Sequence, residues 1–271
     1  MRNPRPPMGV MAPRMPVLVS AQTAPPPAAP AAPAAGTMIE YSSETRFQLD
    51  LHVPEAALAA YLPAGWTPNV AAQGAAKDCN LRAIFVDRVT ISGPNGRPVG
   101  TGSNRLVYLA APVKEPGGTN VQLIIGGLTE DPADAPGPFG NYLNATTHAM
   151  QRTTTSPATS GTPILDTQDW TFAAVTGEKI EMHIKYERGA ANKGNPNDTR
   201  VYSAKNPGFF QIWRQEQVLD ILRNTTTNPP DRVKEFTFKG SGGSYARLFD
   251  GTDKVLSWDN ILWINRTVSL P

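Results

Sequence analysis

Alternation of apolar and polar residues, which is typical of β-strands with one buried face, is the main pattern of the chain beyond residue 37. Residues 45–53 (TRFQLDLHV) show this alternation most clearly. One face of the predicted strand carries Phe47, Leu49, Leu51 and Val53, and the other carries Arg46, Gln48, Asp50 and His52. The pattern predicts a half-buried strand.

Similar runs, separated by short turns rich in Gly, Pro and Asn, predict strands through the rest of the chain. These strands are expected at residues 81–91, 104–113, 120–130, 141–155, 169–175, 178–189, 208–213, 233–240, 244–251 and 260–270. Two helices are expected, at residues 54–62 and 214–225. The predicted fold is mainly β (α+β): a large antiparallel β-sandwich or cone-shaped barrel with a few short helices, which can enclose a small ligand.

The first 37 residues have a different composition and are predicted to be a disordered, Pro/Ala-rich segment. A single β-rich domain, residues 38–271, follows. Ahead of the Pro/Ala repeat, arginines precede a short apolar patch and a Val-Ser-Ala site at 19–21, which is the pattern of a secretory signal remnant. This predicts a periplasmic or secreted protein. The alternative is a disordered tail on a cytoplasmic protein.

Composition and charge exclude several classes of function. The net charge is +2 and the basic residues form no run, so a nucleic-acid partner is not expected. Cys79 is the only cysteine, which excludes an intramolecular disulfide and a cysteine zinc cluster. The three histidines lack metal-binding spacing, so neither a metal nor a cofactor is expected. No stretch is apolar for long enough to predict a membrane span.

The strand expected at 141–155 has one face that is almost wholly polar. This face carries Tyr142, Asn144, Thr146, His148, Met150 and Arg152. It is either exposed to solvent or lines a pocket for a polar ligand. In a pocket, His148 would serve as acid or base because imidazoles titrate near neutrality, and Arg152 would hold a carboxylate by two hydrogen bonds. Tyr142 and Asn144 would bind the substrate.

Arg214 is a further substrate-binding candidate. It follows the aromatic run of the segment PGFFQIWRQEQ, residues 207–217. The segment predicts either a solvated helix start next to core aromatics, or a junction whose Trp213 or Arg214 reaches the cavity.

Three segments resemble the acetoacetate decarboxylase-like superfamily: VPEAALAAYLPAGWTP (53–68), GPFGNYLN (137–144) and SGTPILD (160–166). The resemblance implies a β-rich fold with a small-molecule pocket, and in that family a lysine forms a Schiff base with the keto acid. Here Ile164 stands at the position that matches the lysine, and the glutamate expected after the GPF turn is replaced by Asn141 and Tyr142. The resemblance therefore implies the fold without implying that reaction.

These observations predict a small-molecule enzyme of acetoacetate decarboxylase-like fold. It would act on an organic acid or carbonyl compound by lyase- or hydrolase-type chemistry without a Schiff base, with His148 and Arg152 as catalytic residues. The alternative is a non-catalytic small-molecule binding protein of the cell envelope. A surface interaction domain on a Pro/Ala stalk is a third hypothesis, and homo-oligomerisation is left open.

Overall fold

The computed structural model describes residues 36–74, 76–132, 141–224 and 232–271. All of them belong to the unit Pro33–Pro271, which is described here by itself. The segment predicted to be disordered, residues 1–37, lies outside the described residues except for its last two. The same holds for residues 137–140, the turn in the second segment that resembles the decarboxylase family.

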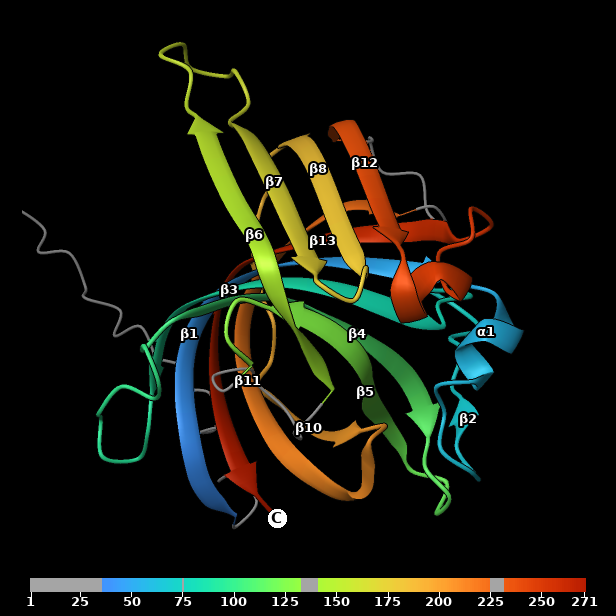
Figure 1. Ribbon diagram of the computed structural model, residues 1–271. Helices are drawn as coiled ribbons and strands as arrows, with labels where there is room; N and C mark the ends of the chain where they lie inside the picture. The colour runs from blue at the N-terminus through green and yellow to red at the C-terminus, as the bar shows by residue number, and fades with distance from the viewer. Residues whose placement is uncertain (1–35, 75, 133–140, 225–231) are drawn as a thin grey trace, which may run out of the picture. The chain divides into compact units, whose positions relative to one another are not determined.

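The described chain is almost entirely β-structure (Figure 1). Its strands are β1 (Thr37–His52), β2 (Thr67–Pro68), β3 (Leu81–Ser92), β4 (Asn104–Lys114), β5 (Asn120–Thr129), β6 (Tyr142–Thr155), β7 (Leu165–Ala174), β8 (Lys179–Glu187), β9 (Asn192–Lys193), β10 (Asn197–Ser203), β11 (Asn206–Asn224), β12 (Val233–Ser241) and β13 (Lys254–Leu270). The helical elements are α1 (Glu55–Ala59) and the 3-10 helix η2 (Gly243–Arg247).

The central feature is a closed ring of strands. Hydrogen bonding runs in the order β4-β3-β1-β13-β11-β10-β5, and β5 pairs back with β4 to close the ring. Most neighbours are antiparallel, but β5 is parallel to both β10 and β6. The mainly β class predicted from the sequence is confirmed, whereas the pairing is mixed rather than wholly antiparallel. Long connections, rather than hairpins, bring β6 and β10 to β5 and so permit parallel pairing.

A second layer continues from β5 through β6, β7, β8 and β12, which lie side by side in Figure 1. The larger apolar cluster lies between this layer and the outer face of the ring, since it joins Phe47 and Phe85 of the ring to Trp170, Phe172 and residues of β8. The rings of Phe85 and Trp170, for example, have centroids 5.7 Å apart. Burial of these large side chains stabilises the layer against the ring.

A second apolar cluster lies within the ring and includes Ile84, Tyr108 and Trp213. Strands β3, β4 and β5 are therefore buried on both faces, which agrees with their nearly continuous apolar sequences. The predicted half-buried character of β1 is wrong for the same reason. Its polar residues Glu44, Arg46 and Asp50 are buried on the inner face of the ring.

Two secondary-structure predictions near the C-terminus are also wrong. Residues 214–224 are strand rather than helix, because β11 pairs with β10 and with β13 along its length, and this pairing overrides the helix propensity of Arg, Gln, Glu and Leu. Residues 244–251 hold the 3-10 helix η2 and turns rather than a strand. Tyr245, Leu248 and Phe249 are the buried residues there, and their spacing is helical rather than alternating.

Candidate functional site

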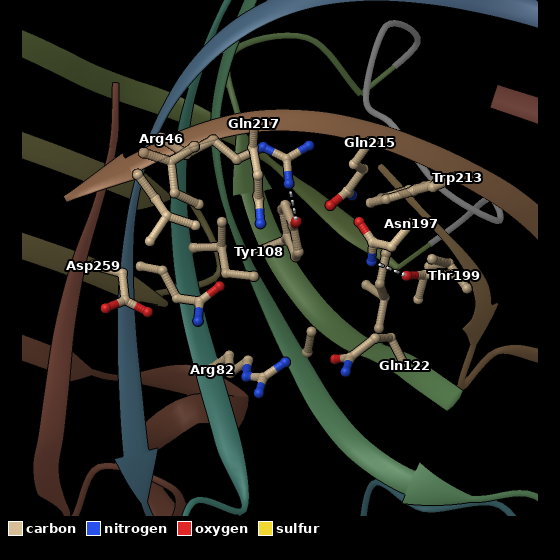
Figure 2. A pocket seen from close by; sticks show the side chains of 17 residues that line it. Arg46, Arg82, Tyr108, Gln122, Asn197, Thr199, Trp213, Gln215, Gln217 and Asp259 are labelled. Carbon is tan, nitrogen blue, oxygen red and sulfur yellow. Dashed lines mark hydrogen bonds between the residues drawn. The ribbon is translucent and has the colours of Figure 1, made fainter. Parts of the chain in front are cut away.

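A cavity of about 300 Å³ lies inside the ring of strands. Its lining comes from alternate residues of β1, β3, β4, β5, β10, β11 and β13, because every second side chain of a strand points to the same face. On β11, for example, the lining residues are Trp213, Gln215, Gln217 and Leu219. Figure 2 shows the labelled side chains directed into this one space from several strands. The closed ring thus gathers polar side chains that are far apart in the sequence.

One wall of the cavity ends in a buried cluster of charged residues around Glu44. The guanidinium of Arg46 binds the Glu44 carboxylate at 2.6 Å and donates a hydrogen bond of 3.2 Å to the Tyr108 hydroxyl (Figure 2). Arg266 and Arg88 approach the same carboxylate at 2.8 and 3.4 Å, and both also pair with Glu40. Of these three arginines, Arg46 lines the cavity.

The cluster around Glu44 carries a positive excess, because three guanidiniums face two carboxylates. Burial by itself would raise the pKa of Glu44, but Arg266, Arg46 and Arg88, with a hydrogen bond from Ser42, lower it to about 2. Glu44 is therefore ionised throughout the neutral range. The remaining positive charge favours a ligand with a negative group at this end of the cavity.

Tyr142, one of the predicted substrate-binding residues, reaches the same cluster from β6. Its hydroxyl is buried, and this burial raises the pKa of Tyr142 well above its usual value. Gly127 makes the approach possible, since a Cβ at that position would lie 2.7 Å from the Tyr142 ring and from the Val107 carbonyl oxygen. Tyr142 thus packs behind the charged cluster and is not among the residues that line the cavity.

A second group of charged residues lines the cavity away from Glu44. Asp50 is buried and accepts hydrogen bonds from Ser257 at 2.7 Å and from Arg82 and Gln48, each at 3.1 Å. Asp259 lies beside this group and lines the cavity, with Gln48 as its neighbour across the β1–β13 pair. Within the described part of the chain, its buried Oδ1 atom has no hydrogen-bond partner.

Burial raises the pKa of Asp259 to about 7, and the nearby Asp50 carboxylate adds to this effect against the opposing charge of Arg82. The two carboxyl groups therefore differ in environment. Asp50 is held by three donors, whereas Asp259 directs an unpartnered oxygen into a buried space. A carboxyl group that titrates near neutrality inside a cavity can give or take a proton during a reaction.

Carboxamide side chains form much of the remaining wall. They belong to Gln48, Gln122, Asn197, Gln215 and Gln217. Asn197 donates to the Thr199 hydroxyl at 3.2 Å (Figure 2), and Gln48 donates to Asp50. Aliphatic side chains of Ile84, Ile124, Val201 and Leu219 lie between them. The cavity is therefore polar on several sides, which suits a small polar ligand better than a purely apolar one.

The structure places His148 and Arg152 away from this cavity. His148 has 42% of its side chain exposed, and its Nε2 lies 3.5 Å from Glu130. Arg152 contacts the buried Asp166 at 3.3 Å. A register shift between Ala145 and Thr147 changes which face of β6 is directed to the core, so the even-numbered residues beyond it lie on the side of the second layer that carries Trp170. Their catalytic role stays a prediction.

Asn144 and Arg214 are not directed into the cavity either. Asn144 is exposed near the start of β6. Arg214 lies on β11 between two lining residues, so its side chain points to the opposite face, where it pairs with Asp198 at 3.3 Å. Of the five residues predicted for the site, Tyr142 alone reaches the charged cluster behind the cavity.

Part of the cavity wall was visible in the alternation of residues 45–53, where the lining residues Arg46 and Gln48 share a face with Asp50. An exposed polar face and a face that lines a closed polar cavity have the same sequence pattern. The one signal in the sequence was the near-continuous apolar character of the neighbouring strands. It indicates strands that are buried on both faces, and β1 lies beside such a strand.

Neither metal coordination nor a membrane-spanning helix is found in the described residues. No group of three or more His, Cys, Asp or Glu side chains in the described ranges is placed to hold a metal ion. No helix in the same ranges is long and apolar enough to cross a membrane.

Comparison with known proteins finds similar structures but no similar sequences. No protein-family model and no curated protein matches the chain. The enduracididine biosynthesis enzyme MppR with HEPES buffer bound aligns at a TM-score of 0.51 and 9% identity, over 87% of each chain. MppR complexed with pyruvate aligns at 0.51 and 12% identity, over 88% of this chain and 90% of that one.

An acetoacetate decarboxylase-like enzyme from Sphingomonas wittichii RW1 aligns at a TM-score of 0.49 and 11% identity, over 87% of this chain and 92% of that one. The likeness to MppR is the one that shows the fold of this chain. The mainly β fold predicted from the sequence is confirmed by the likeness to MppR, and at such low identity that comparison shows the fold alone.

Proposed function

We propose that this chain is a small-molecule enzyme that binds an organic acid or carbonyl compound in the ring cavity and acts on it by lyase- or hydrolase-type chemistry without a Schiff base. The observation that carries the proposal is Asp259. Its carboxyl lines the cavity, has a buried oxygen without a partner among the described residues, and has a pKa raised to about 7 by burial. Such a group is suited to general acid–base catalysis at neutral pH.

Arginines at two places in the cavity support an acidic substrate. Arg46 lies at the positive cluster around Glu44, and Arg82 lies beside Asp50 and Asp259. The nitrogens of Arg46 are engaged by Glu44 and Tyr108, so this residue attracts a carboxylate by its charge, whereas Arg82 holds Asp50 through Nε and can bind a carboxylate through its two terminal nitrogens. A substrate carboxylate at Arg46 would leave the rest of the molecule free to extend along the cavity toward Asp259.

The proposed chemistry does not use an imine, because a Schiff base requires an amine in contact with the substrate. Among the described residues that line the cavity, none is a lysine. Lys179 and Lys185, which the sequence places on an outward-facing strand face, form ion pairs with Glu181 and Glu235, each at 2.7 Å. These pairs lie in β8 and between β8 and β12, in the second layer.

The assignment of acid–base chemistry to His148 remains an alternative within the same proposal. His148 would need a substrate at the edge of the second layer, where its side chain is largely exposed and contacts Glu130. The carboxyl of Asp259 instead lies largely buried in the cavity, with Arg82 nearby. Burial strengthens electrostatic interactions with a reacting group, so the cavity is the better place for catalysis.

A non-catalytic binding protein of the cell envelope is the second candidate function. The carboxamide wall favours it, because amides bind ligands without taking part in proton transfer. The two functions differ in what Asp259 does. A binding protein uses it for affinity alone, whereas an enzyme uses it for turnover.

The test is a comparison of Asp259→Asn with wild type on a panel of hydroxy acids, keto acids and lactones, with product formation followed by NMR. Turnover should fall by about 10²- to 10⁴-fold while ligand binding, measured by calorimetry, survives. Asp169→Asn is the matched control, since Asp169 pairs with His183 on the exposed side of the second layer. Unchanged turnover in Asp259→Asn would contradict the assignment of acid–base chemistry to Asp259.

Two further results separate the alternatives. Saturable binding without turnover of any panel member would favour the binding protein. Borohydride reduction with a keto acid, followed by intact mass, should give no adduct. A stable adduct would show that a lysine acts as the nucleophile and would overturn the imine-free chemistry.

A further inference from the structure

We propose that the natural ligand of the ring cavity is a polyhydroxylated acid of about monosaccharide size, such as an aldonic or uronic acid, and not a simple keto acid. This inference rests on the proposed function, because it specifies the substrate class of the same site. It comes from the kind of polar groups in the cavity wall and from their distribution around the ring.

Uncharged carboxamides are the most numerous polar groups of the wall. Five of them line the cavity, and they come from four strands: Gln48 on β1, Gln122 on β5, Asn197 on β10, and Gln215 and Gln217 on β11. The Thr199 hydroxyl adds a further neutral polar group next to Asn197, at 3.2 Å. A ligand in the cavity would therefore meet hydrogen-bonding groups around much of its circumference (Figure 2).

Strand register explains why these amides are directed at the same space. Asn197 lies directly opposite Gln215 across the β10–β11 pair, and Thr199 lies opposite Trp213. Gln122 neighbours Val201 across the parallel β5–β10 pair. Residues that lie opposite one another in a sheet share a face, so this part of the wall carries polar side chains interspersed with the apolar Trp213 and Val201.

Several of these amides are available to a ligand. In the described structure, the side chains of Gln122, Gln215 and Gln217 form no hydrogen bond with another side chain or with the backbone. Each carboxamide offers two N–H donors and an oxygen acceptor. These three side chains are half-buried, so they bind water in the free protein, and a ligand with hydroxyl groups can replace that water.

A simple keto acid matches this wall poorly. Its carboxylate and ketone oxygens are all acceptors, so it can bind the arginines and the amide N–H groups but gives nothing to the amide oxygens. A hydroxyl is both donor and acceptor, and it can pair with a carboxamide in either orientation. A chain of hydroxyl groups therefore satisfies both halves of each amide, and one carboxylate satisfies the positive end at Arg46.

The size and remaining surface of the cavity agree with such a ligand. A volume of about 300 Å³ equals that of roughly ten water molecules in the liquid. A six-carbon hydroxy acid fills a space of this order far better than a three-carbon keto acid does. Aliphatic side chains between the amides, among them Ile124, Val201 and Leu219, would contact the C–H groups of the carbon chain.

The experiment is calorimetric titration of the full chain with gluconate and galacturonate, compared with pyruvate, acetoacetate, hexanoate and the neutral polyol glucitol. Hexanoate has the carbon count of gluconate without the hydroxyls, and glucitol has the hydroxyls without the charge. We expect a hydroxy acid to bind at least tenfold more tightly than hexanoate or the keto acids. A site built for hydroxyl groups discriminates strongly against analogues that lack them.

Variants of the amide wall test the residues themselves. Gln217→Leu and Gln122→Leu keep the side-chain size and should each weaken gluconate binding about tenfold. Because they lie on different strands, misfolding of one leaves the other as a test, and circular dichroism establishes folding for both. Glu216→Gln is the matched control, since Glu216 alternates with the lining residues Gln215 and Gln217 on β11 and points away.

The outcomes separate this inference from the function on which it rests. Keto acids or hexanoate binding as tightly as gluconate, with no effect of the glutamine variants, would overturn the polyhydroxylated ligand and leave the proposed function standing. Glucitol binding as tightly as gluconate would support the amide wall but contradict an acidic substrate. Failure of every acid to bind would overturn the proposed function, and this inference with it.

Discussion

Two buried carboxylates in this chain are each held by arginines, but their surroundings differ. Glu44 lies inside the ring among Arg46, Arg88 and Arg266, whose side chains are almost fully buried. Asp166 lies in the second layer and accepts from Arg188 at 2.6 Å and Arg152 at 3.3 Å. Those two arginines keep 30% and 24% of their side chains exposed.

The difference in exposure decides whether an arginine can act on a ligand. Arg152 and Arg188 divide their contacts between Asp166 and solvent, so their positive charge is screened and they order the β6–β7–β8 layer. Arg46 has no such exposure, and the part of it that does not face Glu44 and Tyr108 faces the cavity. The same pair of residue types thus stabilises a sheet in one region and presents an unscreened cation to a ligand in the other.

Removal of the carboxylate should give the largest difference between the two regions. Glu44→Gln removes the carboxylate that three buried guanidiniums share and leaves Glu40 to pair with Arg88 and Arg266, so the free energy of unfolding should fall by about 3 to 5 kcal/mol. Asp166→Asn should cost about 1 to 2 kcal/mol, because its arginines can turn to water. Urea unfolding at pH 7 measures both, and equal losses would contradict the distinction.

The pH dependence sharpens this first prediction. Because the pKa of Glu44 is lowered to about 2 in the folded chain, its stabilising contribution is present above the unfolded pKa of 4.5 and is lost as the pH falls toward 2. The stability difference between wild type and Glu44→Gln should therefore shrink over that interval.

Asp259 provides the opposite case, a carboxyl in the ring without an arginine bound to it. Its pKa is raised to about 7, so the folded state holds the proton longer than the unfolded state, and ionisation destabilises the fold as the pH rises from about 4 to 7. Asp259→Asn should be about 2 kcal/mol more stable than wild type at pH 8 and equally stable at pH 4. Asp259 is only partly buried, so this stability difference is smaller than the one expected for a fully buried carboxyl group. A constant difference across that range would contradict the assignment.

Exchange of the arginines tests their ligand contacts directly. Arg46→Lys keeps the charge but loses the hydrogen bonds that fix the cation on Glu44 and Tyr108 at the cavity wall, so the affinity for an acidic ligand should fall about tenfold. Arg152→Lys should leave that affinity unchanged, because Arg152 contacts Asp166 in the second layer. Calorimetry on both variants checks this, and a loss confined to Arg152→Lys would move the ligand to the second layer.

His148→Gln should have the smallest effect. The side chain is largely exposed and meets Glu130 at 3.5 Å, so its replacement should change the free energy of unfolding by about 0.5 kcal/mol or less. Turnover should also be retained if acid–base chemistry belongs to Asp259. Loss of turnover in this variant with binding intact would restore the role predicted for His148 from the sequence.

Much of the fold could be predicted from residue alternation, since the predicted strands at 81–91, 104–113, 120–130 and 233–240 lie within one residue of the observed ends. The strand at 214–224 could not, because its local preference for helix is overridden by partners from β10 and β13 that are distant in the sequence. The bulge at Ala145 likewise changed the orientation of His148 and Arg152. A single inserted residue reverses the two faces of a strand, and the sequence carries no clear sign of it.

The sequence by itself determined which residues share a face, because the side-chain period of a strand is a local property of the backbone. It therefore placed Arg46, Gln48 and Asp50 on one face of a strand. The tertiary structure alone decided that this face is enclosed, through the pairing of β5 with β4 that closes the ring. Closure removes water from a polar face, and the loss of water is what raises the pKa of Asp259 and leaves the charge of Arg46 unscreened for a ligand.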